Sequence, residues 1–71
     1  MIELHLLHVD GTLKYIFSDL SECNNYYVNI KTQFTSNVVY EKRELLKVDI
    51  IEMRRRCKKA QVKMIGDFND L

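Results

Sequence analysis

A change in hydrophobic period near Leu46 constrains the fold of this chain more than any other feature of its sequence. Before that residue, apolar side chains recur at every second position in several segments, which is typical of strands with one buried face. After it, apolar residues recur at intervals of four and three positions, which places them on one face of a helix. The sequence therefore predicts an α+β protein in which strands come first and a helix follows.

The first part of the chain has the pattern of a β-hairpin. Residues 2–6 alternate apolar and polar side chains, and the apolar residues Leu13, Tyr15 and Phe17 then alternate with the polar residues Lys14 and Ser18. Asp10-Gly11 lies between them, and this dipeptide is a strong signal for a tight two-residue turn. Residues 18–25 are polar and turn-prone, so we expect a loop there.

Two further segments are predicted to continue the sheet. Residues 26–34 show the longest alternation in the chain, with one apolar and one wet face. A turn at 35–37 would lead into residues 38–40, which are strand formers. The charged tetrad 41–44 fits either an extension of this fourth strand or the start of the helix. The simplest arrangement is an antiparallel meander of three to four strands packed on one C-terminal amphipathic helix.

The predicted helix presents one apolar stripe to the sheet. Gly66 is a natural helix stop, and residues 66–71 form an acidic tail that we expect to fray. Four residues of the stripe, Ile50, Met53, Cys57 and Ala60, would meet the apolar side chains of 26–34, namely Tyr26, Val28, Ile30 and Phe34. The complete stripe comprises Leu46, Ile50, Met53, Cys57, Ala60 and Met64.

Length and composition indicate a single small folded domain, 1–71. A core of this size rarely supplies more than about 3–5 kcal/mol of stability, so a second copy or a larger partner is expected. The hydrophobic content of 46% and charged content of 30% are typical of a folded globular protein. No secretory signal and no membrane-spanning stretch are recognisable, and two isolated cysteines do not form a disulfide framework. We therefore expect a cytoplasmic protein.

The order of these segments resembles that of the small FlbD/SwrD-like flagellar proteins, and small phage and mobile-element proteins share the same template. The matching pieces are Met1-Ile2-Glu3-Leu4, Asp10-Gly11, Tyr15 through Ser21, Val38-Val39-Tyr40-Glu41, and Ile50 through Arg56. The resemblance implies a sheet followed by a helix. It also implies a flagellar accessory role, or a small protein that works by docking on a host protein.

The sequence contains no recognisable catalytic or metal-binding pattern. His5 and His8 are three residues apart in a predicted strand, so they should point to opposite faces of the sheet and cannot share one ion. Cys23 and Cys57 lack the C-x-x-C spacing of a zinc site, and there is no Gly-rich phosphate loop. The chain is therefore predicted to be non-enzymatic, with neither metal nor cofactor.

Positive charge is concentrated near the C-terminus of the predicted helix. Six of the eleven basic residues lie in this segment: Arg54, Arg55, Arg56, Lys58, Lys59 and Lys63. Such a surface can contact phosphates or the acidic side chains of a protein, and it can also be a solvated face near a helix C-terminus. An isolated helix after a sheet lacks helix-turn-helix geometry, which favours contact with charge over reading of bases.

Apolar side chains outnumber the positions that one sheet and one helix can bury. Adjacent apolar pairs point to both faces of an element, so one member of each pair should remain exposed. The candidates for a protein interface are Leu7, Tyr27, Val39, Leu45 and Ile51. This surplus favours a homodimer or a larger protein partner.

These features together predict a small, non-enzymatic protein-interaction module. It would act as a modulator or inhibitor, encoded by a phage or mobile element, that docks on a larger host protein. Nucleic-acid binding through the basic helix is the first alternative, and the flagellar accessory role implied by the resemblance is the second.

Overall fold

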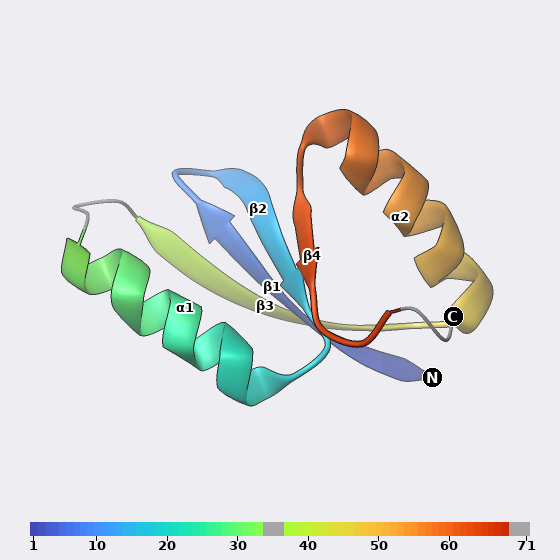
Figure 1. Cartoon of the computed structure of the whole chain (residues 1–71), viewed down its shortest axis with the longest axis horizontal. Coiled ribbons are helices and arrows are strands. Elements are labelled where there is room, and N and C mark those ends of the chain that lie inside the picture. Colours follow the sequence, from blue (N-terminus) through green and yellow to red (C-terminus); the bar gives the residue numbers. More distant parts are fainter. Residues whose placement is uncertain (34–36, 69–71) are drawn as a thin grey trace.

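The computed structural model describes residues 1–33 and 37–68 (Figure 1). Within them the chain forms β1 (Ile2–Val9), β2 (Thr12–Phe17), α1 (Leu20–Gln33), β3 (Val38–Leu45), α2 (Lys47–Ala60) and β4 (Lys63–Ile65). The strands form one sheet in the order β3-β1-β2-β4. The predicted α+β class is confirmed, and the ambiguous tetrad 41–44 belongs to β3.

The sheet is mixed, so the prediction of an antiparallel meander is wrong. β1 pairs antiparallel with β2 on one side and with β3 on the other, whereas β4 pairs parallel with β2. α1 connects β2 to the far side of β1, and α2 leads the chain back to the opposite edge. The first helical crossover, through α1, replaces the loop and third strand of the predicted meander, and the second runs through the helix α2 to β4, a strand that the sequence did not predict.

The predicted hairpin is confirmed, with one irregularity that decides which side chains share a face. Asp10 and Gly11 have φ values of 53° and 81°, the left-handed conformation that a tight two-residue turn requires. Leu7 pairs with Tyr15 and the next residue of β1, His8, pairs with Leu13, so the intervening Lys14 forms a β-bulge. The bulge turns Leu13 to the face opposite Tyr15.

Residues 26–34 were predicted as a strand, but all of them that are described belong to the helix α1. Cys23, Tyr27 and Ile30 are four and three residues apart, which is helical spacing, and they lie on the side that packs against the sheet. Glu22 in the first turn and Lys31 in the last complement the helix dipole. The predicted turn at 35–37 and the inward position of Phe34 lie outside the described residues, apart from Asn37.

α2 confirms the predicted stripe in its centre and differs from the prediction at both ends, where Leu46 is a 52% exposed N-cap residue and Ala60 is exposed. Ile50 and Cys57 are buried and Met53 packs beside them. The helix ends at Ala60 because Gln61 adopts a left-handed conformation with φ 59°, well before the predicted stop at Gly66. Met64 therefore lies on β4 and reaches the same core from the sheet.

The two faces of the sheet carry separate apolar clusters, and α1 and α2 lie on opposite sides (Figure 1). The predicted contact between the apolar side chains of 26–34 and the α2 stripe is therefore wrong. The cluster under α2 is built on Leu4, Leu6, Ile16, Ile50, Cys57 and Phe68. The cluster under α1 is built on Leu7, Phe17, Cys23 and Val38, with Tyr15, Tyr26 and Ile30 packed beside them.

In the predicted tail 66–71 the structure describes residues 66–68, which make defined contacts with the rest of the fold. Phe68 is 5% exposed in the α2-side cluster, and its carbonyl accepts a hydrogen bond from Arg54 Nη1 at 3.1 Å. The N–H of Asp67 donates to Ser18 Oγ at 3.0 Å.

Neither of the described helices is long and apolar enough to cross a membrane.

Candidate functional site

The two histidines lie on opposite faces of the sheet, as predicted. His5 is 4% exposed on the α1 side, where its Nδ1 lies 2.7 Å from the Tyr40 hydroxyl and the two rings stack. His8 is half-buried on the α2 side, and its Nε2 lies 2.9 Å from Glu41 Oε1. Each histidine therefore has a partner of its own, and the two cannot act on one ligand.

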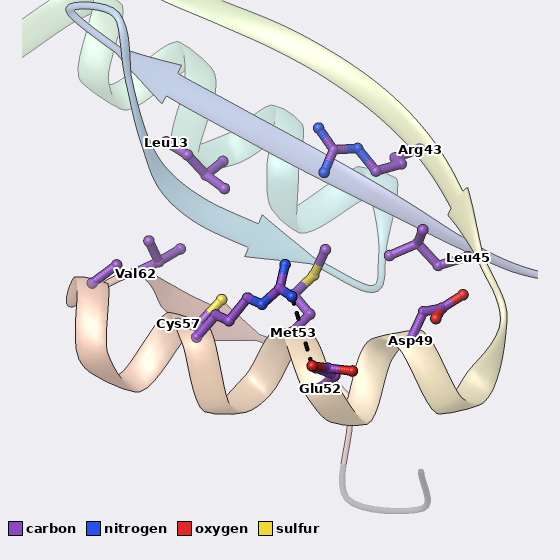
Figure 2. A pocket seen from close by; sticks show the side chains of 10 residues that line it. Leu13, Arg43, Leu45, Asp49, Glu52, Met53, Cys57 and Val62 are labelled. Carbon is purple, nitrogen blue, oxygen red and sulfur yellow. Dashed lines mark ion pairs between the residues drawn. The ribbon is translucent and has the colours of Figure 1, made fainter.

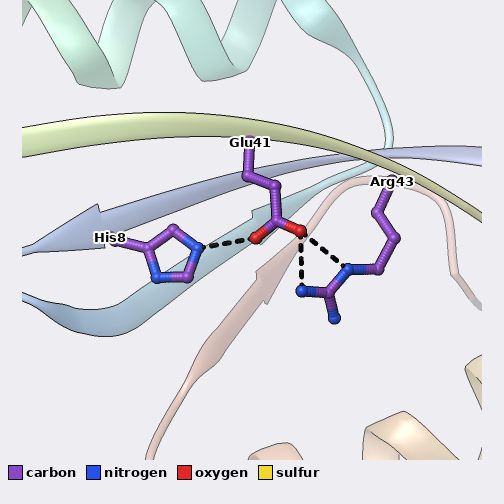
Figure 3. Close-up of polar contacts among 3 residues, drawn as sticks. All are labelled: His8, Glu41 and Arg43. Atoms are coloured by element: carbon purple, nitrogen blue, oxygen red, sulfur yellow. Dashed lines mark hydrogen bonds and ion pairs between the residues drawn. The ribbon is translucent and has the colours of Figure 1, made fainter.

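Glu41 connects His8 to Arg43 (Figure 3). Its second carboxylate oxygen accepts hydrogen bonds from Arg43 Nη2 at 2.7 Å and from Arg43 Nε at 3.0 Å. The Arg43 hydrogen bonds, followed by the one from His8, lower the pKa of the Glu41 carboxyl below its usual range. The carboxylate therefore stays ionised at neutral pH and holds Arg43 in place on the face of β3.

The thiols do not have the environment of reactive cysteines. Cys23 and Cys57 are both free and buried, each in one of the apolar clusters. Burial raises the pKa of both thiols, which disfavours the nucleophilic thiolate. The prediction that residues 18–25 form a loop is wrong from Leu20 onward, because α1 begins there and its first turns bury Cys23. Among the described residues, no group of three His, Cys, Asp or Glu side chains lies close enough together to hold a metal ion.

An open groove of about 430 Å³ lies between α2 and the sheet (Figure 2). Leu13 and Leu45 line it from the sheet side, and Met53 and Cys57 line it from α2. α2 runs beside β4 (Figure 1), and the groove is lined by residues of β2, β3 and α2 and by Val62. An apolar side chain of a partner fits such a surface.

The rim of the groove carries charges of both signs. Asp49, Glu52 and Arg56 stand on the α2 side, and Arg43 stands on the β3 side. Arg56 and Glu52 form an exposed ion pair at 3.6 Å, a weak interaction of the i,i+4 type. The groove therefore has no strong preference for either charge.

The structure divides the predicted basic segment into several surfaces. Arg54 is half-buried and bonded to the Phe68 carbonyl, and Arg56 lies on the groove side, whereas Lys58 is exposed beside Arg54. Lys63 lies on β4, so the prediction that it extends the helix surface by another turn is wrong. The exposed side of α2 carries Arg55 and Lys59.

Two aliphatic residues lie on that same exposed side. Val48 is 68% exposed and Ile51 is 40% exposed. Val48, Ile51, Arg55 and Lys59 follow one another at intervals of three, four and four residues, which puts them on one side of the helix. We call these four residues the α2 outer face. Sequence reasoning named Ile51 and missed Val48, although Val48 stands one turn before Ile51 and away from the buried stripe.

The other predicted interface residues occupy different positions. Leu7 is fully buried under α1, so its predicted exposure is wrong; the sequence suggested a sheet covered on one face, and both faces are covered. Tyr27 is half-buried against the same cluster, with Lys31 Nζ 5.4 Å from its ring centroid. Leu45 lines the groove, and Val39 is 51% exposed on β3.

Comparisons of this chain with protein-family models, with curated proteins and with solved structures find no match. The FlbD/SwrD-like resemblance therefore stays a hypothesis from sequence. What this chain can bind has to be argued from its own surfaces.

Proposed function

We propose that this chain is a small, non-enzymatic interaction module that docks on a larger protein through the α2 outer face. The observation that carries the proposal is the exposure of Val48 and Ile51 beside Arg55 and Lys59 on one side of the helix. Exposed aliphatic side chains next to positive charge fit a partner surface that is apolar in its centre and acidic at its edge.

The aliphatic pair favours a protein partner over a nucleic acid. Burying a valine or isoleucine side chain contributes about 1.5–3 kcal/mol, and a complementary apolar surface is needed to realise it. A phosphate backbone offers charge but no such surface. The arginine and lysine would chiefly speed association and select an acidic partner.

The neighbouring flank of α2 widens the positive surface. Lys47, Arg54 and Lys58 are seven and four residues apart, so they line one side of the helix next to the outer face. A module that docks on a larger protein through such a face would serve as a modulator or inhibitor of that protein.

The test is a capture experiment with matched variants. The tagged protein and the double variant V48D/I51D are used to capture partners from a lysate of the native source, with a short-range cross-linker. We expect the wild type to capture a protein in stoichiometric amount, and V48D/I51D to lose it at least tenfold. V28D is the control, because Val28 is 50% exposed on α1 and lies outside the outer face.

A second variant separates charge from apolar contact. R55E/K59E keeps Val48 and Ile51 and reverses the charge beside them, so it should weaken capture mainly at low salt. Circular dichroism confirms that each variant folds. Capture that is equal in the wild type, V48D/I51D and V28D would contradict the proposal.

Nucleic-acid binding is the second candidate function, because five basic residues lie on adjoining sides of α2 at helical spacing: Lys47, Arg54, Arg55, Lys58 and Lys59. Fluorescence anisotropy with random single- and double-stranded oligonucleotides tests it across a range of salt concentrations. Binding by phosphate contact would weaken steeply with salt, and R55E/K59E would flatten that dependence. V48D/I51D leaves the basic residues in place, so its binding would be weakened only by the two added charges.

A further inference from the structure

β3 is the longer of the two edge strands of the sheet. β3 spans eight residues, Val38–Leu45, whereas the strand at the other edge, β4, spans three. An edge strand of this length presents a row of backbone N–H and C=O groups that another strand can pair with. We propose that β3 pairs antiparallel with β3 of a second copy of this chain, which joins the two sheets into one.

Symmetry limits the pairings that β3 can make with itself. A two-fold axis that makes neighbouring strands antiparallel stands perpendicular to the sheet, so each face of one copy continues into the same face of the other. Residues that pair directly must therefore point to the same face. This condition holds only when one residue of β3 stands directly opposite the same residue of the second copy. We call that residue the centre of the register.

The charges of β3 select the register centred on Lys42. Glu41 then stands directly opposite Arg43 of the second copy, and Arg43 opposite Glu41, so two acid–base pairs form on the α2 face. Glu41 and Arg43 are already bonded within one chain, so the dimer would gather two carboxylates and two guanidinium groups into a neutral cluster. Opposite charges that face each other across strands stabilise a sheet.

The apolar residues at the ends of β3 agree with the same register. Val39, 51% exposed in the monomer, stands opposite Leu45 of the second copy. Both side chains lie on the α2 face, because Val39 pairs with His8 and Leu45 pairs with Ile2 on β1. The pairing would cover the exposed aliphatic surface of β3 at both ends of the joint strand pair.

The neighbouring registers are less favourable. A pairing centred on Glu41 places the two Glu41 carboxylates opposite each other. A pairing centred on Arg43 places the two guanidinium groups opposite each other, and fewer residues pair because β3 ends at Leu45. The register centred on Lys42 opposes two ammonium groups, but acids surround them. Glu3 of the same chain lies 3.7 Å from Lys42 Nζ, and Glu44 of the second copy stands diagonally across. Charges that disfavour these two neighbouring registers and fit the one centred on Lys42 are a means of specifying a pairing.

Self-association is tested by analytical ultracentrifugation, without any knowledge of a partner protein. We expect the wild type to sediment as a dimer of 8.5 kDa chains, and V39K as a monomer. V28K is the matched control, since Val28 and Val39 are 50% and 51% exposed and only Val39 lies on the edge strand. V28K should remain dimeric. A monomeric wild type, or equal association of V39K and V28K, would overturn the proposal.

The register is tested by single cysteine substitutions along β3. K42C should form an intermolecular disulfide under mild oxidation, because the two side chains face each other across the axis. E41C and R43C place the thiols of the two copies farther apart and should cross-link at least tenfold more slowly. The native thiols are buried and give little background. Fastest cross-linking through E41C or R43C would overturn the proposed register, and equal slow cross-linking at all three positions would overturn the pairing.

Discussion

At the scale of single residues, Glu41 and Gly66 each stabilise this small fold. Glu41 does so through its side-chain hydrogen bonds, and Gly66 does so because it has no side chain. Glu41 is bonded to His8 on the neighbouring strand and to Arg43 on its own. Gly66 allows the chain to turn tightly against Ser18 after β4. Neither role is visible in the hydrophobic pattern, because each depends on partners that are distant in the sequence.

Glu41 makes stability depend on pH in the acid range. Its pKa is lowered in the folded state, so the unfolded chain binds the proton more readily, and the stabilisation is lost as the pH falls through the folded pKa. Wild type should exceed E41Q in free energy of unfolding by less than about 1 kcal/mol at neutral pH, because these groups are partly exposed.

The measurement is urea unfolding of both proteins in the V39K background, so that association does not contribute. The difference between wild type and E41Q should begin to shrink as the pH falls to the pKa of an ordinary glutamate, about 4.3, and should continue to shrink as the pH falls through the lower folded pKa of Glu41. A difference of the same size at pH 7 and pH 3 would show that the charge of Glu41 is unimportant.

Gly66→Ala should destabilise the protein more than Gly11→Ala. Both glycines have positive φ values, 123° and 81°, so an alanine is strained at either position. At Gly66 the new methyl group would also collide with the Ser18 side chain, whereas at Gly11 it would meet open space. We expect losses of about 1 kcal/mol at Gly11 and about 2 kcal/mol or more at Gly66. Equal losses in chemical unfolding would contradict the close packing at Ser18.

At the scale of elements, the sequence predicts a helix or strand correctly where the spacing of its apolar residues fits only one kind of secondary structure. The β1–β2 hairpin and the centre of α2 could be predicted, because Asp10-Gly11 and the Ile50–Met53–Cys57 spacing each favour one structure. α1 could not, since residues 26–34 alternate like a strand while Cys23, Tyr27 and Ile30 also repeat like a helix. Tertiary packing against β1 and β2 decides between the two. β4 was missed because three residues carry too little pattern.

The helical assignment of α1 makes a direct prediction for Tyr26 and Val28. In a strand, both side chains would lie on the same apolar face. In the helix, Tyr26 packs against the sheet and Val28 is exposed to solvent. The Tyr26 ring packs 5.0 Å from Phe17 and 5.5 Å from Tyr15, measured between centroids, whereas Val28 is 50% exposed. Tyr26→Ala should lower the free energy of unfolding by about 2 kcal/mol or more, and Val28→Ala should change it by less than about 0.5 kcal/mol. Similar losses for both would contradict the helix.

At the scale of the whole molecule, the placement of the helices decides which predicted surfaces remain available. α1 and α2 cover opposite faces of the sheet, which buries Leu7 and leaves the edge strand and the outer side of α2 exposed (Figure 1). The sequence predicted a surplus of apolar side chains, and Ile51 and Val39 do stand exposed. It could not predict their separation onto two surfaces, because that depends on the crossover connections.

The two proposed surfaces are compatible with each other. Pairing through β3 around an axis perpendicular to the sheet would place both copies of α2 on the same side of the joined sheet. Two α2 outer faces would then be presented together, and a partner with repeated sites could bind both and gain avidity. Failure of the dimer would leave docking through a single α2 untouched.

The central claim is that the α2 outer face binds protein, and the most direct measurement is capture from the native lysate with and without nuclease. Wild type is compared with V48D/I51D in both conditions. We predict that one protein partner is captured in stoichiometric amount, survives nuclease treatment, and is lost with V48D/I51D. Recovery of nucleic acid, with every captured protein lost after nuclease, would contradict the claim and identify the basic surface of α2 as the functional site.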